Sequence, residues 1–86
     1  MKELEKILKA FANKRRLAII KYVKYKREAS VGDIAEEIEL SFKATSKHLN
    51  ILLAADILEK DQIGLQMFYR LNSNQRSAAK QIISLL

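Results

Sequence analysis

The sequence contains no cysteine, no proline, no tryptophan and a single histidine. The absence of cysteine excludes disulfide bonds, thiolate metal ligands and cysteine nucleophiles, and it fits a reducing compartment. One histidine without cysteine does not make a histidine-rich metal site. We therefore expect neither a metal ion nor another cofactor.

Long hydrophobic runs are absent as well. No apolar segment approaches the roughly 20 residues that cross a bilayer, and the amino terminus alternates charged and apolar side chains, unlike a signal peptide. These features predict a cytoplasmic protein that does not enter a membrane. The only glycines, Gly32 and Gly64, form no glycine-rich phosphate loop, and no nucleophile and base stand in a recognisable motif. An enzyme is therefore not expected.

The length of 86 residues is enough for one compact domain, which we expect to span residues 1–86. Hydrophobic residues make up 49% of the chain and charged residues 30%, which is ordinary for a folded globular protein. A domain of this size hides only about 60 to 70% of the surface that its unfolded chain exposes. A second copy would cover more of that surface, which favours a homodimer.

Charge is segregated along the chain, although its sum is +6. Residues 1–27 hold ten Lys or Arg against two acids, residues 28–61 hold three against eight, and residues 62–86 hold three against none. A basic surface of this kind is typical of nucleic-acid binding, although an anionic membrane surface would attract it too.

Helical periodicity and capping residues predict four helices in the first two thirds of the chain. Apolar residues recur every three or four positions in residues 2–11. Asn13 is a suitable N-cap for a second helix that ends near residue 26. Ser30 and Asp33 resemble a capping box for a third, short helix. Ser41 would cap a fourth helix over about residues 42–55.

The period then changes from 3.6 to 2, which predicts a β-hairpin of residues 57–62 and 65–71. Ser73 would cap a last helix that reaches residue 86. The predicted fold is mainly α with a small β-hairpin, in the order of four helices, two strands and one helix. The short polar turn between the third and fourth helices is helix-turn-helix geometry.

The fourth helix combines an inner and an outer face. Thr45, Leu49 and Leu52 can face inward, and the spacing of three and four places a polar row on the outer face: Lys43, Ser46, Lys47 and Asn50. His48 is expected to pack or to cap, not to bind a metal or to act as a base. Lys24, on the second helix, is expected to be solvated.

Four segments stand in a characteristic order. Residues 8–17 contain the pair Arg16-Leu17, residues 31–36 begin the third helix, residues 40–49 contain Ser46-Lys47-His48-Leu49, and residues 57–71 form the hairpin. This ordered set resembles the ArsR-type (arsenical-resistance repressor) family of winged helix-turn-helix regulators. The four segments look like the family's opening pattern, the start of its third helix, its recognition helix and its wing.

The resemblance implies a dimeric repressor that binds double-stranded DNA at a near-palindromic operator. Helices 2–11 and 73–86 would form the dimer contact, through the apolar residues Leu4, Ile7, Leu8, Phe11, Ala78, Ile82 and Leu85. The expected DNA contacts are Lys43, Ser46, Lys47, Asn50, Lys14, Arg15, Ser41, Phe42 and Arg70. The lysines of the fourth helix can bind phosphates or guanine edges. Phe42 is expected mainly to pack against the preceding turn, although it could instead touch a thymine methyl group.

Two departures from the family pattern concern metals. Ser30 and Gly32 occupy the positions at which metal-sensing members carry a Cys-x-Cys pair, and residues 73–86 contain neither histidine nor acid. The sequence therefore predicts no metal sensing by either site. The alternative reading is a winged-helix module that binds protein, which the apolar hairpin tip at Ile63 and Leu65 and the acidic middle segment would favour.

Overall fold

The computed structural model describes residues 1–86 and contains five helices and three strands. The helices are α1 (Lys2–Phe11), α2 (Lys14–Lys26), α3 (Val31–Ile38), α4 (Phe42–Ala54) and α5 (Ser77–Ser84). The strands are β1 (Ala29–Ser30), β2 (Leu58–Ile63) and β3 (Gln66–Leu71). None of the helices is long and apolar enough to cross a membrane. The mainly α fold with a hairpin between the fourth and fifth helices confirms the predicted fold class.

Three predicted N-caps are present in the structure. The side chain of Asn13 accepts from the backbone N–H groups of Arg15 and Arg16. Ser30 accepts from the N–H of Asp33, and Ser41 accepts from the N–H of Ala44. Each contact satisfies a backbone donor that the first turn of a helix leaves unpaired, so these side chains fix where α2, α3 and α4 begin.

The last helix begins later than predicted. The expected start at Ser73 is wrong, because residues 72–76 form a connection that is bonded to the hairpin. The N–H of Ser73 donates to Glu59 over 3.3 Å, and the side-chain amide of Gln75 donates to the carbonyl of Ile57 over 2.7 Å. Helix α5 therefore begins at Ser77, with Arg76 at the N-cap position.

The sheet has one strand more than the sequence predicted. The two-residue strand β1 pairs with β3 in antiparallel register, Ala29 opposite Tyr69, and β3 pairs with β2 along the whole hairpin. The strand order is β1-β3-β2. Because β1 directly precedes α3, this pairing ties the hairpin to the helix-turn-helix segment.

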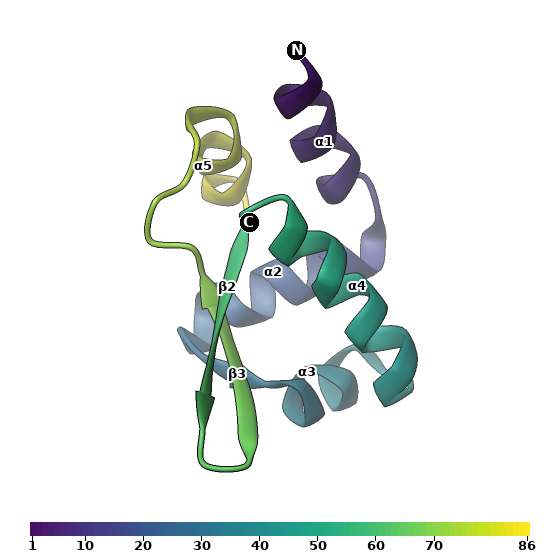
Figure 1. The fold of residues 1–86 in the computed structure, drawn as a ribbon. Coiled ribbons are helices and arrows are strands. Elements are labelled where there is room, and N and C mark those ends of the chain that lie inside the picture. Colours follow the sequence, from purple (N-terminus) through teal and green to yellow (C-terminus); the bar gives the residue numbers. More distant parts are fainter.

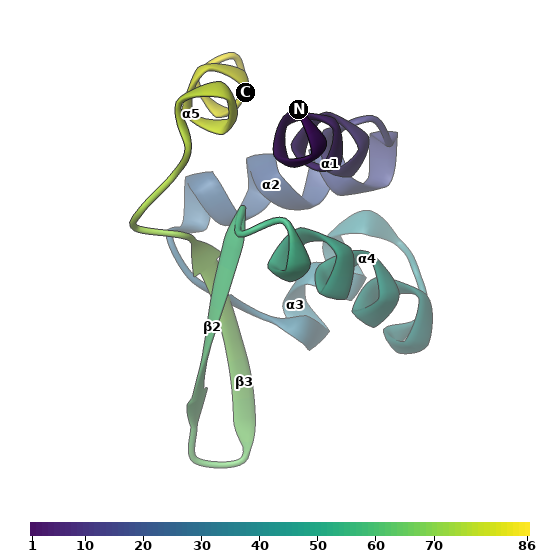
Figure 2. The ribbon, with the colours of Figure 1, turned by 45° about the horizontal axis from the view of Figure 1, so that its top comes forward.

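The core lies around α2. Ile19, Ile20 and Val23 of this helix have no solvent exposure, and they pack in one cluster with buried residues of the other helices and of β2 and β3. In both views α1 and α5 lie at one end of the molecule, and the hairpin extends toward the opposite end (Figures 1 and 2). Helices α3 and α4 lie on the other side of α2 from α1 and α5 (Figure 2).

Candidate DNA-binding surface

Helix α4 presents the polar row that its sequence predicted. Its inner residues Thr45, Leu49 and Leu52 are fully buried. On the outer face Lys43, Lys47 and Asn50 are exposed, and Ser46 is half-buried. None of these four side chains makes a hydrogen bond or an ion pair within the chain, so all four are free to contact a ligand.

The start of α4 adds an aromatic group to this row. Phe42, the first residue of the helix, is 61% exposed, although we expected it mainly to pack against the preceding turn. The hydroxyl of Ser41 accepts from the N–H of Ala44, and its own proton is left to donate. The amino-terminal end of α4 thus offers apolar surface and hydrogen-bond donors side by side.

The turn between α3 and α4 is held by a backbone hydrogen bond and by an arginine side chain of α2. Glu39 ends α3 in the left-handed conformation, with φ of 55°. The N–H of Leu40 donates to the carbonyl of Ala35 over 3.1 Å, which closes the last turn of α3. The guanidinium of Arg15 donates to the carbonyl of Ile38. These bonds hold the start of α4 at a defined place against α3.

Three cationic side chains of α2 bind carbonyl groups at the ends of other helices. Arg15 reaches Ile38 in α3, Arg16 reaches Ala10 in α1 over 2.6 Å, and Lys24 reaches Ile83 in α5 over 3.0 Å. The last carbonyl groups of a helix lack intrahelical partners and carry partial negative charge, so a cation stabilises them. Part of the basic character of α2 therefore serves packing between helices.

These contacts bear on two expectations. Arg15 is half-buried and bonded to α3, which disfavours a contact with a phosphate. Lys24 is exposed, as expected, but its amino group is also bonded to the carbonyl of Ile83 in α5. Lys14, in contrast, is exposed and has no partner in the chain. The sequence could not reveal these bonds, because a backbone carbonyl acceptor carries no residue signature.

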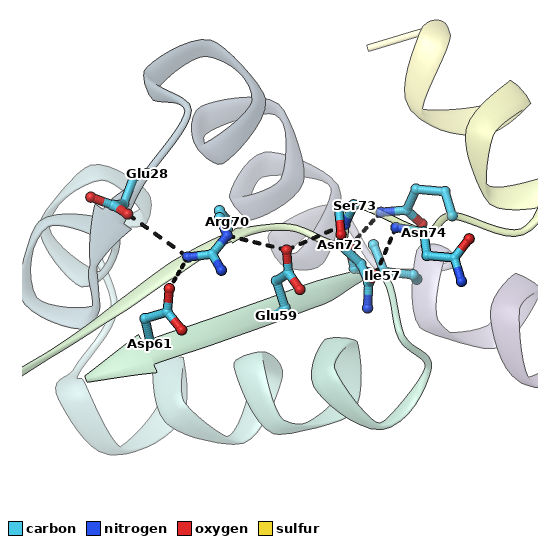
Figure 3. A network of polar contacts seen from close by, with 9 residues as sticks. Glu28, Ile57, Glu59, Asp61, Arg70, Asn72, Ser73 and Asn74 are labelled. Carbon is cyan, nitrogen blue, oxygen red and sulfur yellow. Dashed lines mark hydrogen bonds and ion pairs between the residues drawn. The ribbon is translucent and has the colours of Figure 1, made fainter. Parts of the chain in front are cut away.

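The arginine of the wing, Arg70, is surrounded by three carboxylate groups (Figure 3). Arg70 donates to Asp61 and, over 3.1 Å, to Glu59, and Glu28 lies 4.0 Å away. The hydrogen bond to Asp61 raises the pKa of Arg70. Three acids around one arginine leave this cluster net negative, which disfavours the expected contact of Arg70 with DNA.

The tip of the wing is apolar. Leu65 is fully exposed, and Ile63 is also exposed. Gly64 between them has a φ of 65°, in the left-handed region that glycine adopts without strain. The tip thus offers no cation to a phosphate.

The residues expected at the dimer contact fall into two groups. Ile7 and Phe11 are only 3% and 5% exposed, because they pack into the core of their own chain. The expectation that these two contact a partner is corrected accordingly. The other group keeps surface on α1 and on and just after α5: Leu4, Leu8 and Leu85 are exposed, and Ala78 and Ile82 are half-buried. A shallow hollow of about 460 Å³ on α1 lies over Leu4 and Leu8.

The residues at which the resemblance would place metal ligands are Ser30 and Gly32, before and in α3, and those of α5. Ser30 is buried, and its hydroxyl serves as the N-cap of α3. Gly32 has no side chain, and α5 contains neither histidine nor acid. No group of three or more His, Asp or Glu side chains gathers where it could hold a metal ion.

The family model for bacterial regulatory proteins of the arsR family matches residues 13–60, which is more than half of the chain. This chain belongs to the arsR family. The matched segment includes α2, α3, α4 and the first part of β2.

Two curated relatives agree with the arsR assignment. The transcriptional activator HlyU of Vibrio cholerae is 34% identical over 77 residues, which covers 90% of this chain and 70% of HlyU. The arsenical resistance operon repressor of Bacillus subtilis is 31% identical over 75 residues, which covers 87% of this chain and 71% of the repressor.

Solved structures show the same fold. HlyU of Vibrio cholerae superposes with a TM-score of 0.83 at 34% identity, over 96% of this chain and 86% of that chain. A homodimeric winged helix-turn-helix DNA-binding domain from Mycobacterium bovis has a TM-score of 0.83 at 24% identity, over 98% and 74% of the two chains. This arsR-family chain is therefore a winged helix-turn-helix domain of a DNA-binding transcription regulator.

Proposed function

We propose that this chain acts as a homodimeric repressor that binds a near-palindromic operator, with one α4 helix in the major groove of each half-site. The observation that carries the proposal is the outer face of α4. This face combines two lysines with amide and hydroxyl groups, and the chain leaves all of them without a partner. A major groove accepts a helix, and its base edges offer matching donors and acceptors.

The side chains of this face have different expected roles. Lys43 and Lys47 would bind phosphates or guanine edges, and Ser46 and Asn50 would hydrogen-bond to phosphates or bases. Phe42 is placed to contact a thymine methyl group, a role that its exposure favours over packing.

The amino-terminal ends of α2 and α4 would hold the backbone. Lys14 is exposed at the start of α2, and Ser41 lies at the start of α4 with a hydroxyl proton to donate. Helix amino termini favour anions, so both positions suit a phosphate. Arg15 and Arg70 are left out of the proposed contact, because their guanidinium groups are bonded within the chain.

The dimer contact would be formed by α1 and by the carboxyl-terminal helix and the residues that follow it. These elements lie side by side at one end of the molecule (Figure 2), and their exposed apolar residues are Leu4, Leu8 and Leu85. The domain from Mycobacterium bovis with the same fold is described as homodimeric, which supports a dimer here. Ala78 and Ile82 would lie at the edge of this contact.

We further propose that DNA binding does not depend on metal ions. The hydroxyl of Ser30 is engaged in a helix cap, Gly32 offers no ligand, and α5 offers no imidazole or carboxylate. Soft metals such as cadmium require thiolate or imidazole ligands. Neither the start of α3 nor α5 provides a thiolate or an imidazole.

Repression is the proposed direction of regulation, since a dimer that covers promoter DNA excludes other proteins from it. The relative from Bacillus subtilis is named a repressor, and the one from Vibrio cholerae is named an activator. The direction depends on where the operator lies relative to the promoter.

Two measurements test the proposed function. Duplexes selected from a random pool should share a near-palindrome, and titrations at two salt concentrations should show tighter binding to the selected than to the random duplexes. Sedimentation at micromolar concentration should give the mass of two chains. Equal affinity for all duplexes, or a monomeric mass, would contradict the proposal.

A further inference from the structure

The side chain of Arg16 lies where three helices meet. Its Nε donates to the carbonyl of Ala10 over 2.6 Å, and its Nη2 donates to the carbonyl of Lys9 over 3.1 Å. Its Nη1 lies 3.2 Å from Nδ1 of His48. One guanidinium on α2 thus contacts the last turn of α1 and the middle of α4.

The chemistry of this contact fixes the state of the imidazole. A guanidinium group can only donate, so Nδ1 of His48 must accept, and the ring proton must lie on Nε2. Burial and the nearby charges of Arg16 and Arg15 lower the pKa of His48, in agreement with a neutral ring. His48 therefore acts as a hydrogen-bond acceptor from α2.

The bond is the only side-chain hydrogen bond that joins α4 to another helix. The remaining contacts of α4 with the core are made largely by apolar side chains such as Leu49 and Leu52. Apolar burial has no directional preference, whereas a hydrogen bond requires a defined distance and angle. The contact of Arg16 with His48 therefore restricts the position of α4 relative to α1 and α2.

We propose that Arg16 is a positioning residue for DNA recognition, which through His48 fixes α4 relative to α1 and thereby sets the half-site spacing that the dimer reads. The inference rests on the proposed function, in which α1 belongs to the dimer contact and α4 enters the groove. A change in the angle between these helices leaves each α4 able to read its own half-site. It shifts the distance between the two copies of α4.

The test uses the selected operator and a series of duplexes in which the half-sites are moved by single base pairs, up to about three in either direction. We expect the wild-type protein to lose roughly tenfold or more in affinity when the spacing departs from its optimum. In Arg16→Ala and His48→Ala this penalty should shrink to about twofold, because α4 is then held by apolar contacts alone, which have no directional preference. Affinity for a duplex with one half-site should stay within about twofold of wild type.

A conservative variant serves as the control. Asn at position 48 places an amide oxygen at the branch position that Nδ1 occupies, so His48→Asn should retain the spacing penalty. The two His48 variants leave the contacts of Arg16 with α1 intact. The comparison between them therefore holds even if Arg16→Ala fails to fold, as judged by circular dichroism.

A second readout needs no DNA. His48 is the only histidine, so long-range nitrogen–proton NMR spectra report on this ring alone. We expect an unprotonated Nδ1 in the wild-type protein and a shift toward a mixture of tautomers in Arg16→Ala. A proton on Nδ1 at neutral pH in the wild-type protein would overturn the inference.

The outcomes separate the inference from the proposed function. If the His48→Ala and Arg16→Ala variants lose affinity by one factor on every spacing and on the single half-site, the contact is merely structural and the inference is wrong. If the wild-type protein binds its operator without any spacing preference, the inference fails and the proposed function stands. If the wild-type protein prefers no duplex at all, the proposed function fails.

Discussion

The lysines of α4 provide the sharpest test of how this protein would read DNA. Lys43 and Lys47 lie one turn apart on the exposed face of the helix, and neither is engaged in an ion pair. Replacement of either by alanine removes a cation without disturbing a contact inside the chain. We therefore expect folding to be unchanged and DNA affinity to fall.

The size of the loss depends on what each lysine contacts. If Lys47 binds only a phosphate, a dimer loses two contacts, and the slope of log affinity against log salt should become less steep by about 1.8. The ratio of wild-type to variant affinity would then be about tenfold larger at the lower of two salt concentrations that differ fourfold. If Lys47 reads a guanine edge, the variant should lose about 1 to 3 kcal/mol per contact on the preferred duplex and tolerate other bases at that position.

The assay is a titration of fluorescent duplexes, preferred and random, at several salt concentrations. The matched control is Lys21→Ala, because Lys21 is an exposed lysine of α2 that makes no hydrogen bond or ion pair. Lys24 is unsuitable as a control, since its amino group is bonded to the carbonyl of Ile83. Should Lys21→Ala weaken binding while Lys43→Ala and Lys47→Ala do not, α4 is not the recognition helix.

Three further predictions concern the dimer, pH and metals. Leu8→Glu should dissociate the dimer, as measured by sedimentation, because it places an unpaired charge in an apolar contact. The chain should stay folded, because Leu8 is 49% exposed in the single chain. The matched change Leu65→Glu at the wing tip should leave the dimer intact. Burial, with the charges of two arginines, lowers the pKa of His48 in the folded state below 6.5, so the unfolded chain takes up this proton first. The free energy of unfolding should consequently fall as the pH drops from 6.5 toward the lower folded-state pKa, and urea titrations should find a weaker dependence in that window for His48→Asn. Zinc, cadmium or arsenite should leave operator affinity unchanged, and a stoichiometric metal effect on binding would show that ligands other than Ser30 and Gly32 form a site.

Local features of this fold could be predicted from the sequence. The caps at Asn13, Ser30 and Ser41 act on backbone groups two or three residues away, so their identity and position are enough to place the helix starts. The outer face of α4 follows from helical spacing alone. The other residues of the candidate site were predicted from the family resemblance.

Features that depend on distant parts of the chain could not be predicted. Ser73 has the chemistry of an N-cap, but Glu59 of β2 holds its backbone in the connection before α5. The acids around Arg70 come from three separate positions, and only the register of the sheet brings them together. The burial of Ile7 and Phe11 likewise reflects how α1 packs, and periodicity does not distinguish a face toward the core from a face toward a partner.

The cations that α2 extends to its neighbours have a consequence for how the chain folds. Helices α1, α3 and α5 have only 10, 8 and 8 residues, lengths at which an isolated helix is marginal in water. Their last carbonyl groups gain a cationic partner only when α2 is in place. Secondary and tertiary structure should therefore form together, and far-ultraviolet circular dichroism and tyrosine fluorescence should report one coincident unfolding transition. In this sense the amphipathic segments of the sequence are helices only as members of the assembled domain.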